Sequence, residues 1–431
     1  MKVVKTAKLK ILTHTQTFDE TIKIYNQALS FYIVVCEQEY LNLQDKKSKE
    51  KLNYIESITH RTAKNRDIKY DFDKDFYKFP SYLRRAVIME ALGVIDSHFS
   101  RLENWEEKKE KALSKGKRFH EKAPKINYQP NSFPTLYKDN MWNKIEEGKA
   151  KIKVFKNSDW VWIDIEYSTK SLKSGQKYRF KNFKEFNPSL VKKGKKYFLH
   201  ISYETDVKLN STPLKKQRVI GVDLGLTNSA VCSCIDSNGT VLDRLFINQS
   251  KEKDQLSHRV NKLSKAKRKS GIFNEKPNHW RRINGLQKFI VQDTVDKIVE
   301  FAIKNRADII VFEYLGKMKL PKNTFGAKRL RAKLQFWAKR KIQQKVGEKA
   351  HSFGIRYSRV LARGTSMYAY DGSGVLDRSY KKDIATFTNG KIYHSDLSAS
   401  YNIASRYFTR AILKPLSEKS RLQVRQKFLI L

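Results

Sequence analysis

The sequence predicts a multidomain α/β protein in which long helices interrupt an amino-terminal β-domain. Three observations support this prediction. The chain has 431 residues, enough for two or three domains at roughly 150 residues each. Apolar residues recur at helical spacing after the opening strand, and they alternate with polar residues between 151 and 204. From residue 217 onwards, buried strands alternate with basic helices, as expected for a separate α/β domain.

The amino-terminal half is predicted to be a β-barrel-like domain interrupted by a helical one. The opening MKVVKTAKLKIL places lysines between apolar residues at every second or third position, as in a strand. Helical spacing over 17–40 places Phe18, Ile22, Tyr25 and Leu29 on one stripe. Strands resume between 151 and 204 in KIKVF, WVWIDI and KYFLHISYE. A single β-domain, split by helices, explains both sets of strands.

A second long helix is predicted after Phe79 and Pro80, with Ser81 as its N-cap. Its inward positions are Leu83, Val87, Ala91 and Ile95. Between the two helices, residues 46–67 are predicted to be a charged, solvated segment.

The carboxy-terminal half has the element order of a ribonuclease-H-like fold. QRVIGVDLGL reads as a buried strand, and AVCSCIDS and TVLDRLFI read as two more, joined through Asn238-Gly239, which predicts a type I′ hairpin. Basic helices, the strand at 307–313, a basic helical stretch to 350 and a strand at 355–360 follow. A last helix begins near Asp396. The order is therefore βββαβαβα.

The charge of the chain indicates a polyanionic partner. There are 88 Lys and Arg against 44 Asp and Glu, a formal net charge of +44. Nucleic acid is the first candidate and an anionic membrane surface the second. No apolar run approaches the ~18 residues of a membrane span, so no membrane partner is expected. The amino terminus does not read as a signal peptide and there are only 3 cysteines, so a cytoplasmic location without disulfides is expected.

Two basic stretches surround the strands that carry the candidate acids. Residues 251–282 contain 11 Lys and Arg against 3 acids, and residues 317–349 contain 12 against 1. Trp280 and Trp337 lie among these cations, which suits backbone tracking and base stacking. The predicted nucleic-acid contacts are Arg84, Arg85, Lys265, Lys267, Arg268, Lys269, Trp280, Arg281, Arg282, Arg331, Lys333, Trp337 and Arg340.

Three acids lie at the ends of strands or helices within apolar sequence: Asp223, Glu313 and Asp396. If the first and fourth strands are neighbours in a mixed sheet, Asp223 and Glu313 emerge at the same edge. The last helix can bring Asp396 over them. Each acid alone could be a cap or a structural ion pair. Together they predict an oxygen-rich catalytic site for two Mg²⁺ or Mn²⁺ ions, roughly 3.5–4 Å apart, that hydrolyses phosphodiester bonds.

Several motifs in this half resemble the TnpB family of insertion-sequence proteins, which are related to type V CRISPR effectors. They are IGVDLGLTN, KLSKAKRKSG, the segment ending ADIIVFEYL, the stretch LRAKLQFWAKRKIQQKVGEKAHSFGIRYSRV, and GTSMYAYDGSG leading to DLSASYNIA. The resemblance covers residues 218 to about 408 in order, and over 1–216 it rests on element order. Asp223, Glu313 and Asp396 match the family's three metal-binding catalytic acids.

The resemblance implies an RNA-guided DNA endonuclease. Its partners would be a guide RNA and target double-stranded DNA beside a short flanking motif, with cleavage in a RuvC site. A small type V CRISPR effector and a repressor that no longer cuts are the alternatives. A monomer is expected, nucleoid-associated in a prokaryotic cytoplasm.

The implied domains follow the family's order. They are the first strand of a wedge β-domain (1–16), a helical recognition domain (17–125), the rest of the wedge (126–212), a RuvC-like nuclease domain of ribonuclease-H fold (213–363), a former zinc-ribbon subdomain (364–394), the last RuvC helix (395–410) and a basic tail (411–431).

The chain departs from the family at the zinc ribbon. In family members, the first half of the ribbon has the sequence TSxxCxxCG. This chain has Thr365-Ser366 followed by MYAYDG at that place, and no cysteine follows Cys234. A tetrahedral thiolate site cannot form, so no zinc is expected. Either the segment folds on its aromatics Tyr368, Tyr370, Tyr380 and Phe387, or it is a mobile loop.

The remaining candidates have simpler explanations. Cys232 and Cys234 are expected to be buried packing residues, and His394 a surface or capping residue. Asn402 matches a family asparagine whose role is either structural or catalytic. IGVDLGLTNSAV also resembles the phosphate loop of actin-like ATPases, but no second glycine-rich loop is evident. A guide-independent resolvase or transposase is a further alternative.

Overall fold

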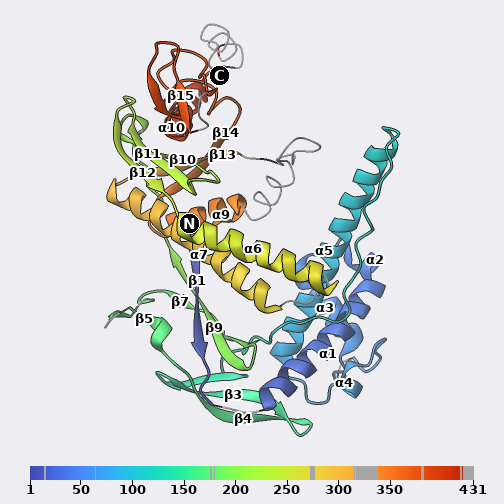
Figure 1. The fold of residues 1–431 in the computed structure, drawn as a ribbon. Coiled ribbons are helices and arrows are strands. Elements are labelled where there is room, and N and C mark those ends of the chain that lie inside the picture. The colour runs from blue at the N-terminus through green and yellow to red at the C-terminus, as the bar shows by residue number, and fades with distance from the viewer. Residues whose placement is uncertain are drawn as a thin grey trace. The chain divides into compact units, whose positions relative to one another are not determined.

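The computed structural model describes residues 1–13, 16–63, 65–174, 177–178, 180–271, 277–314, 316, 338–379, 383–417 and 420. They form two compact units (Figure 1). Val4–Thr205 make the first unit; Met1–Val3 and Asp206–Leu431 make the second.

The first unit contains helices and short sheets. Its helices are α1 (Thr17–Gln38), α2 (Tyr40–Leu43), α3 (Ser48–Thr59), α4 (Phe72–Asp75), α5 (Ser81–Leu113) and the 3₁₀ turn Lys170–Leu172. Its strands are β1 (Lys2–Lys10, whose first two residues belong to the second unit), β2 (Trp142–Glu146), β3 (Lys149–Lys156), β4 (Asp159–Glu166), β5 (Lys173–Ser174), β6 (Lys177–Tyr178), β7 (Lys184–Glu185), β8 (Ser189–Lys193) and β9 (Lys196–Asp206).

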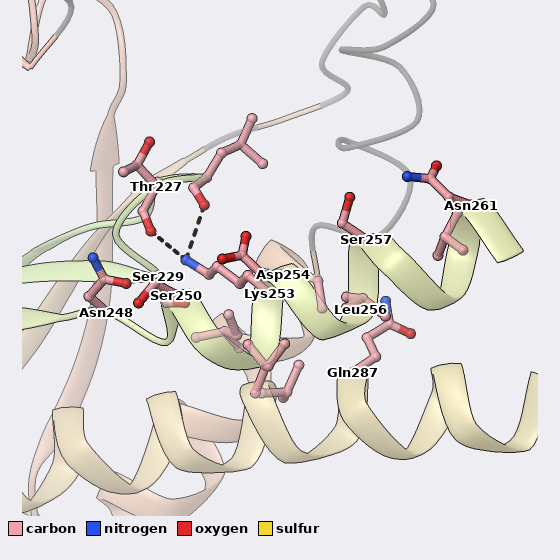
Figure 2. A pocket seen from close by; sticks show the side chains of 17 residues that line it. Thr227, Ser229, Asn248, Ser250, Lys253, Asp254, Leu256, Ser257, Asn261 and Gln287 are labelled. Atoms are coloured by element: carbon pink, nitrogen blue, oxygen red, sulfur yellow. Dashed lines mark hydrogen bonds between the residues drawn. The ribbon is translucent and has the colours of Figure 1, made fainter.

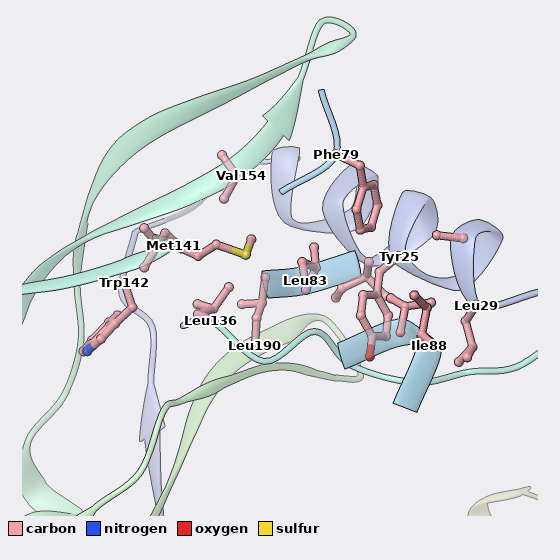
Figure 3. Packing of buried hydrophobic residues seen from close by; sticks show 14 of the residues in the cluster. Tyr25, Leu29, Phe79, Leu83, Ile88, Leu136, Met141, Trp142, Val154 and Leu190 are labelled. Atoms are coloured by element: carbon pink, nitrogen blue, oxygen red, sulfur yellow. The ribbon is translucent and has the colours of Figure 1, made fainter. Parts of the chain in front are cut away.

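The long helices α1 and α5 bury the stripes that the sequence predicts. Tyr25 and Leu29 of α1 and Leu83 and Ile88 of α5 are at most 2% exposed. Figure 3 shows these side chains in one cluster with Val154 of β3. The helical spacing of the apolar residues is therefore confirmed as the pattern of a buried face.

Two local predictions in this unit are wrong. Residues 46–67 are not simply a solvated segment, because α3 buries Leu52 and Ile55 among its charged residues. Ser81 does not cap α5: Pro80 occupies the N-cap position, and no side-chain hydrogen bond caps the helix. Pro80 already fixes the backbone for helix entry, and its missing N–H needs no partner there.

The opening strand pairs with strands far along the chain. β1 lies next to β9 in a sheet of order β1-β9-β7, with β8 also paired to β9, whereas β2, β3 and β4 form a separate antiparallel sheet. The two sheets approach at the end of β1, where Ile11 and Tyr167 form an isolated bridge. Strands on both sides of the helical segment thus fold together.

The second unit is built on one mixed sheet covered on both faces. Its strands are β10 (Arg218–Asp223), β11 (Ala230–Asp236), β12 (Val241–Ile247), β13 (Ile309–Tyr314) and β14 (Arg356–Leu361), in the order β12-β11-β10-β13-β14. Its helices are the 3₁₀ turn Leu214–Lys216, α6 (Ser250–Ser270), α7 (Pro277–Lys304), α9 (Lys339–His351) and α10 (Ser395–Leu413). A hairpin of β15 (Ile384–Thr386) and β16 (Ile392–His394) precedes α10.

Alternate residues of the sheet enter two different cores. Ile220 and Phe312 pack with α7 and α9, while Val219 and Val311 pack with α10 on the opposite face. Burial on both faces explains why these strands read as continuous apolar runs. β10 and β13 are parallel neighbours, as the sequence predicts.

The hairpin between β11 and β12 forms, but its turn is not type I′. Gly239 has a φ of 86°, whereas Asn238 is absent from the residues with positive φ. A type I′ turn needs positive φ at both central residues. Here Asp236 Oδ1 accepts hydrogen bonds from the backbone N–H groups of Asn238 and Thr240, both at 2.9 Å. These bonds form an Asx-type turn in place of the predicted type I′ turn.

The segment that replaces the zinc ribbon has a small aromatic core. Leu376, Ala385 and Phe387 are buried, and Tyr370 and Tyr393 pack against them. Tyr370 also meets Tyr401 of α10 edge to face, with ring centroids 4.9 Å apart. Of the aromatics predicted to hold this segment, Tyr368 is 43% exposed and Tyr380 lies outside the described residues.

Lys391 adds a cation to this core. Its Nζ lies 4.9 Å from the ring centroid of Tyr370 and 5.2 Å from that of Tyr393, and it donates a hydrogen bond of 2.6 Å to the Tyr370 hydroxyl. The ring faces attract the ammonium group, so Lys391 adds to the packing of these aromatics. Aromatic packing organises the described part of this segment.

Helix α10 crosses β10 at Gly221. A Cβ at this position would lie 2.2 Å from the backbone oxygen of Ser400 and 2.9 Å from Ala404 Cβ. Only glycine allows the backbones to come this close. The crossing fixes the height of α10 over the sheet.

None of the described helices is both long enough and apolar enough to cross a membrane.

Glu39 is a buried carboxylate that ties α1 to the following helices. Its side chain is 1% exposed and accepts hydrogen bonds from Lys69 Nζ (2.6 Å), the Tyr54 hydroxyl (2.7 Å), Asn42 Nδ2 (2.8 Å) and the Tyr70 hydroxyl (3.0 Å). Burial opposes ionisation, but these donors outweigh it and lower the pKa of Glu39 to about 2.

We expect Glu39→Gln to destabilise the first unit by about 1–3 kcal/mol at pH 7, because it removes charge-assisted hydrogen bonds. The pKa is lower in the folded than in the unfolded chain, where it is about 4.3. The stabilisation is therefore complete above that value and is lost as the pH falls towards 2. Urea unfolding at pH 7 and pH 3 measures both effects. Glu20→Gln, at an exposed position of α1, is the control; equal stability of the two variants would contradict the prediction.

We expect a zinc chelator such as 1,10-phenanthroline to leave the melting temperature unchanged, because segment 364–394 has no cysteine to bind zinc.

In a second test of the aromatic core, Phe387→Ala should make segment 364–394 sensitive to protease, because truncating a buried Phe costs about 3–5 kcal/mol. Val375→Ala, at a position 54% exposed, is the control. Stoichiometric zinc in the purified protein, or destabilisation by the chelator, would show the prediction to be wrong.

We expect Gly221→Ala to lower the free energy of unfolding of the second unit by about 3 kcal/mol or more, because the added methyl group overlaps backbone atoms of α10. Gly285→Ala is the matched control, since a Cβ there meets nothing within 4 Å and Gly285 lies inside helix α7. This control should be neutral or stabilising by up to about 1 kcal/mol. Chemical denaturation checks both; similar stabilities would refute the close-approach explanation.

Candidate functional site

The three predicted acids lie around one edge of the second unit's sheet. Asp223 ends β10, and Glu313 lies in the parallel strand β13, one residue beyond the last position that pairs with β10. Asp396 is in the first turn of α10, the helix that crosses β10. All three side chains are partly exposed. The fold therefore brings together carboxylates separated by 90 and 83 positions in the chain.

The electrostatics of Asp223 show that the other two acids act on it. Burial raises the pKa of Asp223 well above its usual range, and the charges of Glu313 and Asp396 raise it further. The positive charge of Arg378 acts in the opposite direction. Burial likewise raises the pKa of Glu313, against the lowering effects of the Thr365 hydroxyl and Arg406. Charges that repel in this way are stabilised by a cation.

Thr365 orients the second acid. Its hydroxyl donates to Glu313 Oε1, and its backbone oxygen accepts a hydrogen bond of 2.8 Å from Asn402 Nδ2. Asn402 also donates to the backbone oxygen of Tyr368 at 2.8 Å. Asn402 thus has a structural role, fastening the segment after β14 to α10. Arg406 reinforces this link by donating to the backbone oxygens of Leu361 and Arg363, both at 2.7 Å.

Arg378 is a second neighbour that sequence reasoning did not single out. Its guanidinium donates to the Ser395 hydroxyl at 3.0 Å, next to Asp396. It therefore comes from the former ribbon segment to the base of α10. Neither Thr365, which lies in the turn after β14, nor Arg378 gave a local signal in the sequence, because their positions depend on how the segment packs.

The donor chemistry of the site suits a hard divalent cation, because carboxylate oxygens are the ligands that Mg²⁺ and Mn²⁺ prefer. Within the described part of the chain, however, no three His, Cys, Asp or Glu side chains are grouped closely enough to hold a metal ion as they stand. The fold nevertheless brings the three acids to one edge of the sheet, where the charges of Glu313 and Asp396 reach Asp223. The residues present therefore fit the cation by chemistry.

The predicted nucleic-acid contacts divide into three groups. Lys265, Arg268, Lys269, Arg281, Arg282 and Arg340 are exposed. Lys267 and Trp280 are partly buried and lie together, with Lys267 Nζ 5.2 Å from the indole centroid. Arg331, Lys333 and Trp337 lie outside the described residues.

The prediction that Arg84 contacts nucleic acid is wrong. Its side chain is 7% exposed and forms an ion pair with Glu56 at 3.1 Å, so it is not available to a nucleic acid. Arg85 remains 43% exposed, with Glu56 3.4 Å away. The sequence shows two adjacent arginines, but helical geometry turns only one of them outward.

The minor candidates have structural positions. Cys232 and Cys234 are buried free thiols. His394 occupies the N-cap position of α10 without a capping hydrogen bond, and its ring packs edge to face against Phe246 at 5.0 Å.

Comparison with known proteins agrees with these motifs. Residues 5–156 match the Aq_aa04 family. The TnpB-like protein aq_aa05 of Aquifex aeolicus (strain VF5) is 26% identical over 238 residues, covering 49% of this chain and 74% of that protein. The CRISPR-associated endodeoxyribonuclease Cas12f1 of an uncultured archaeon is 24% identical over 242 residues, covering 52% of this chain and 39% of that protein.

A solved structure shares the fold. CasPhi-2 (Cas12j), bound to crRNA and phosphorothioate-DNA, superimposes with a TM-score of 0.50 at 10% identity, over 94% of this chain and 91% of that chain. The multidomain α/β architecture is thus shared. By sequence, the chain is related to TnpB-like proteins and type V CRISPR effectors.

Proposed function

We propose that this protein is an RNA-guided DNA endonuclease that cuts phosphodiester bonds at Asp223, Glu313 and Asp396. The observation that carries the proposal is the convergence of these acids at one sheet edge, where the charges of Glu313 and Asp396 raise the pKa of Asp223. The positive charges of Arg378 and Arg406 offset the raised pKa values of Asp223 and Glu313 but do not reverse them. The names of the relatives, a TnpB-like protein and an endodeoxyribonuclease, support the same activity.

The three acids would hold two Mg²⁺ or Mn²⁺ ions, which supply activation of a water and stabilisation of the leaving oxygen. The chain's own residues set the geometry. Thr365 holds Glu313 in place, and the crossing at Gly221 places Asp396 over the sheet. Arg378 contributes positive charge beside the acids. The fit to the ions rests on the carboxylate donors.

Nucleic acid would bind along the exposed cations of α6 and α7. Lys265, Arg268 and Lys269 occupy the end of α6, and Arg281 and Arg282 the start of α7. In this proposal the chain binds a guide RNA, which pairs with target DNA beside a short flanking motif. Residues 17–125 would form the recognition domain, and 1–16 with 126–212 the wedge.

Two alternatives to a transposon-type nuclease can be told apart from it by experiment. A repressor that binds without cutting is favoured by the altered ribbon segment, which lacks the cysteines of the family pattern. A small type V effector would use the same site with a CRISPR-derived guide. Sequencing the RNA that co-purifies with the protein distinguishes a transposon-end guide from a CRISPR guide.

We expect the wild-type complex with its cognate guide and Mg²⁺ to cut target DNA, and Asp223→Ala to bind that DNA with unchanged affinity while its cleavage rate falls at least about 1,000-fold. The loss follows because removing one carboxylate of the metal set removes stabilisation of the transition state. Gel-shift and single-turnover cleavage assays measure the two quantities. Glu300→Gln, at an exposed position of α7, is the charge-matched control.

Tight, guide-dependent binding without any cleavage by the wild type would favour the repressor. Cleavage that survives ribonuclease treatment would favour a guide-independent resolvase or transposase. Equal cleavage by Asp223→Ala would remove the proposed site.

A further inference from the structure

The loop that follows Asp223 has an irregular backbone between two strands. Residues 224–229 connect the end of β10 to the start of β11, so any movement of this loop moves the carboxylate at its beginning. The ladder pairs Asp223 with Val231, but residues 224–228 lie beyond it. The loop therefore depends on other contacts for its position.

Lys253 of α6 supplies two of these contacts. Its Nζ donates hydrogen bonds to the backbone oxygens of Leu226 (3.0 Å) and Thr227 (2.6 Å). Figure 2 shows the side chain running from the helix to the two carbonyl groups. Lys253 is thus turned towards the loop, unlike the exposed cations near the end of the same helix.

A second tie holds the other end of the loop. The Ser229 hydroxyl donates to Gln249 Oε1, and Gln249 Nε2 donates to Asp293 Oδ2 and to the Thr294 hydroxyl, both at 2.9 Å. Gln249 is the N-cap residue of α6, and Asp293 and Thr294 belong to α7. The start of α6 is fixed against α7 and holds the loop through two side chains.

Lys253 also lines a cleft of about 740 Å³ between the loop, α6 and α7. Lys253 is partly buried, and this burial lowers the pKa of its ammonium group to about 8. The backbone oxygens of Leu226 and Thr227 accept hydrogen bonds from the ammonium group and so compensate it for the water it loses on burial. An ammonium group held in this way has little freedom to contact nucleic acid at the same time.

We propose that Lys253 is a positioning residue that fixes the loop after Asp223, and through it the orientation of the first acid of the site. The two hydrogen bonds act on the backbone, so the effect does not depend on the side chains of Leu226 or Thr227. The inference rests on the proposed nuclease function for its catalytic consequence, but the tether itself can be measured without cleavage.

The tether is tested on the full-length chain with Lys253→Met, Lys253→Arg and, as control, Lys304→Met. Lys304 is 72% exposed and pairs with Asp243 at 2.9 Å, so its replacement removes the same charge outside the loop. Limited proteolysis with subtilisin, with cut sites mapped by mass spectrometry, should show cleavage within 224–229 at least fivefold faster in Lys253→Met. Lys253→Arg should restore most of the protection, because a guanidinium can donate to both carbonyls.

The consequence for the site is tested with the guide–target complex. Lys253→Met should lower the single-turnover cleavage rate about 10- to 100-fold, raise the Mg²⁺ concentration for half-maximal rate several-fold, and leave the affinity for target within twofold. The affinity for Mn²⁺, measured by electron paramagnetic resonance, should fall by a factor similar to the change in the Mg²⁺ requirement. This measurement does not need cleavage.

The outcomes separate the two proposals. If the wild type does not cut, the proposed function fails, and the protease and Mn²⁺ measurements still decide the role of Lys253. Equal protease sensitivity of Lys253→Met and Lys304→Met would overturn the tether. Faster proteolysis throughout the second unit would show that Lys253 supports the whole fold instead. Weaker target binding with an unchanged Mg²⁺ requirement would overturn positioning in favour of a nucleic-acid contact.

Discussion

The close approach of α10 to β10 at Gly221 is the constraint on which the rest of the site depends. Asp223 and Glu313 are neighbours because two parallel strands are neighbours, which many α/β sheets achieve. Asp396 comes from a helix, and its distance from the strands is set by how deeply that helix packs. The absence of a side chain at Gly221 lets the helix backbone contact the strand directly. The third acid is thereby placed beside the other two.

The polar contacts around Glu313 begin on the same helix α10. Asn402 and Arg406 project from α10 and hold the backbone after β14, and that backbone carries Thr365 to Glu313. A helix, a connecting segment and a carboxylate are therefore positioned as one arrangement. On the other side of Asp223, Gln249 and Lys253 do the same from α6. Helix α10 thus carries Asp396 and supports Glu313, whereas α6 supports the backbone beside Asp223.

Much of this was predictable because it depends on periodicity. The order of strands and helices, the parallel pairing of β10 with β13, and the inward faces of α1 and α5 follow from the spacing of apolar residues. What failed depended on tertiary context. The burial of Arg84 against Glu56 and the short buried stripe of α3 needed knowledge of the facing helix. The turn at Asn238 was decided by Asp236, whose carboxylate competes for the same backbone groups. Thr365, Arg378 and Lys253 act through contacts to distant segments, which no local pattern encodes.

The aromatic core of segment 364–394 also changes what the protein is sensitive to. A ribbon closed by four thiolates fails when its metal is withdrawn or its sulfurs are oxidised, whereas stacked rings and a lysine respond to neither. The chain's 3 cysteines are all buried, and burial raises the pKa of each thiol, of Cys234 to about 11 and of Cys36 to about 12. Thiols in this state react slowly with peroxides and alkylating agents. The protein therefore offers oxidants no reactive cysteine through which they could disturb the segment beside its acids.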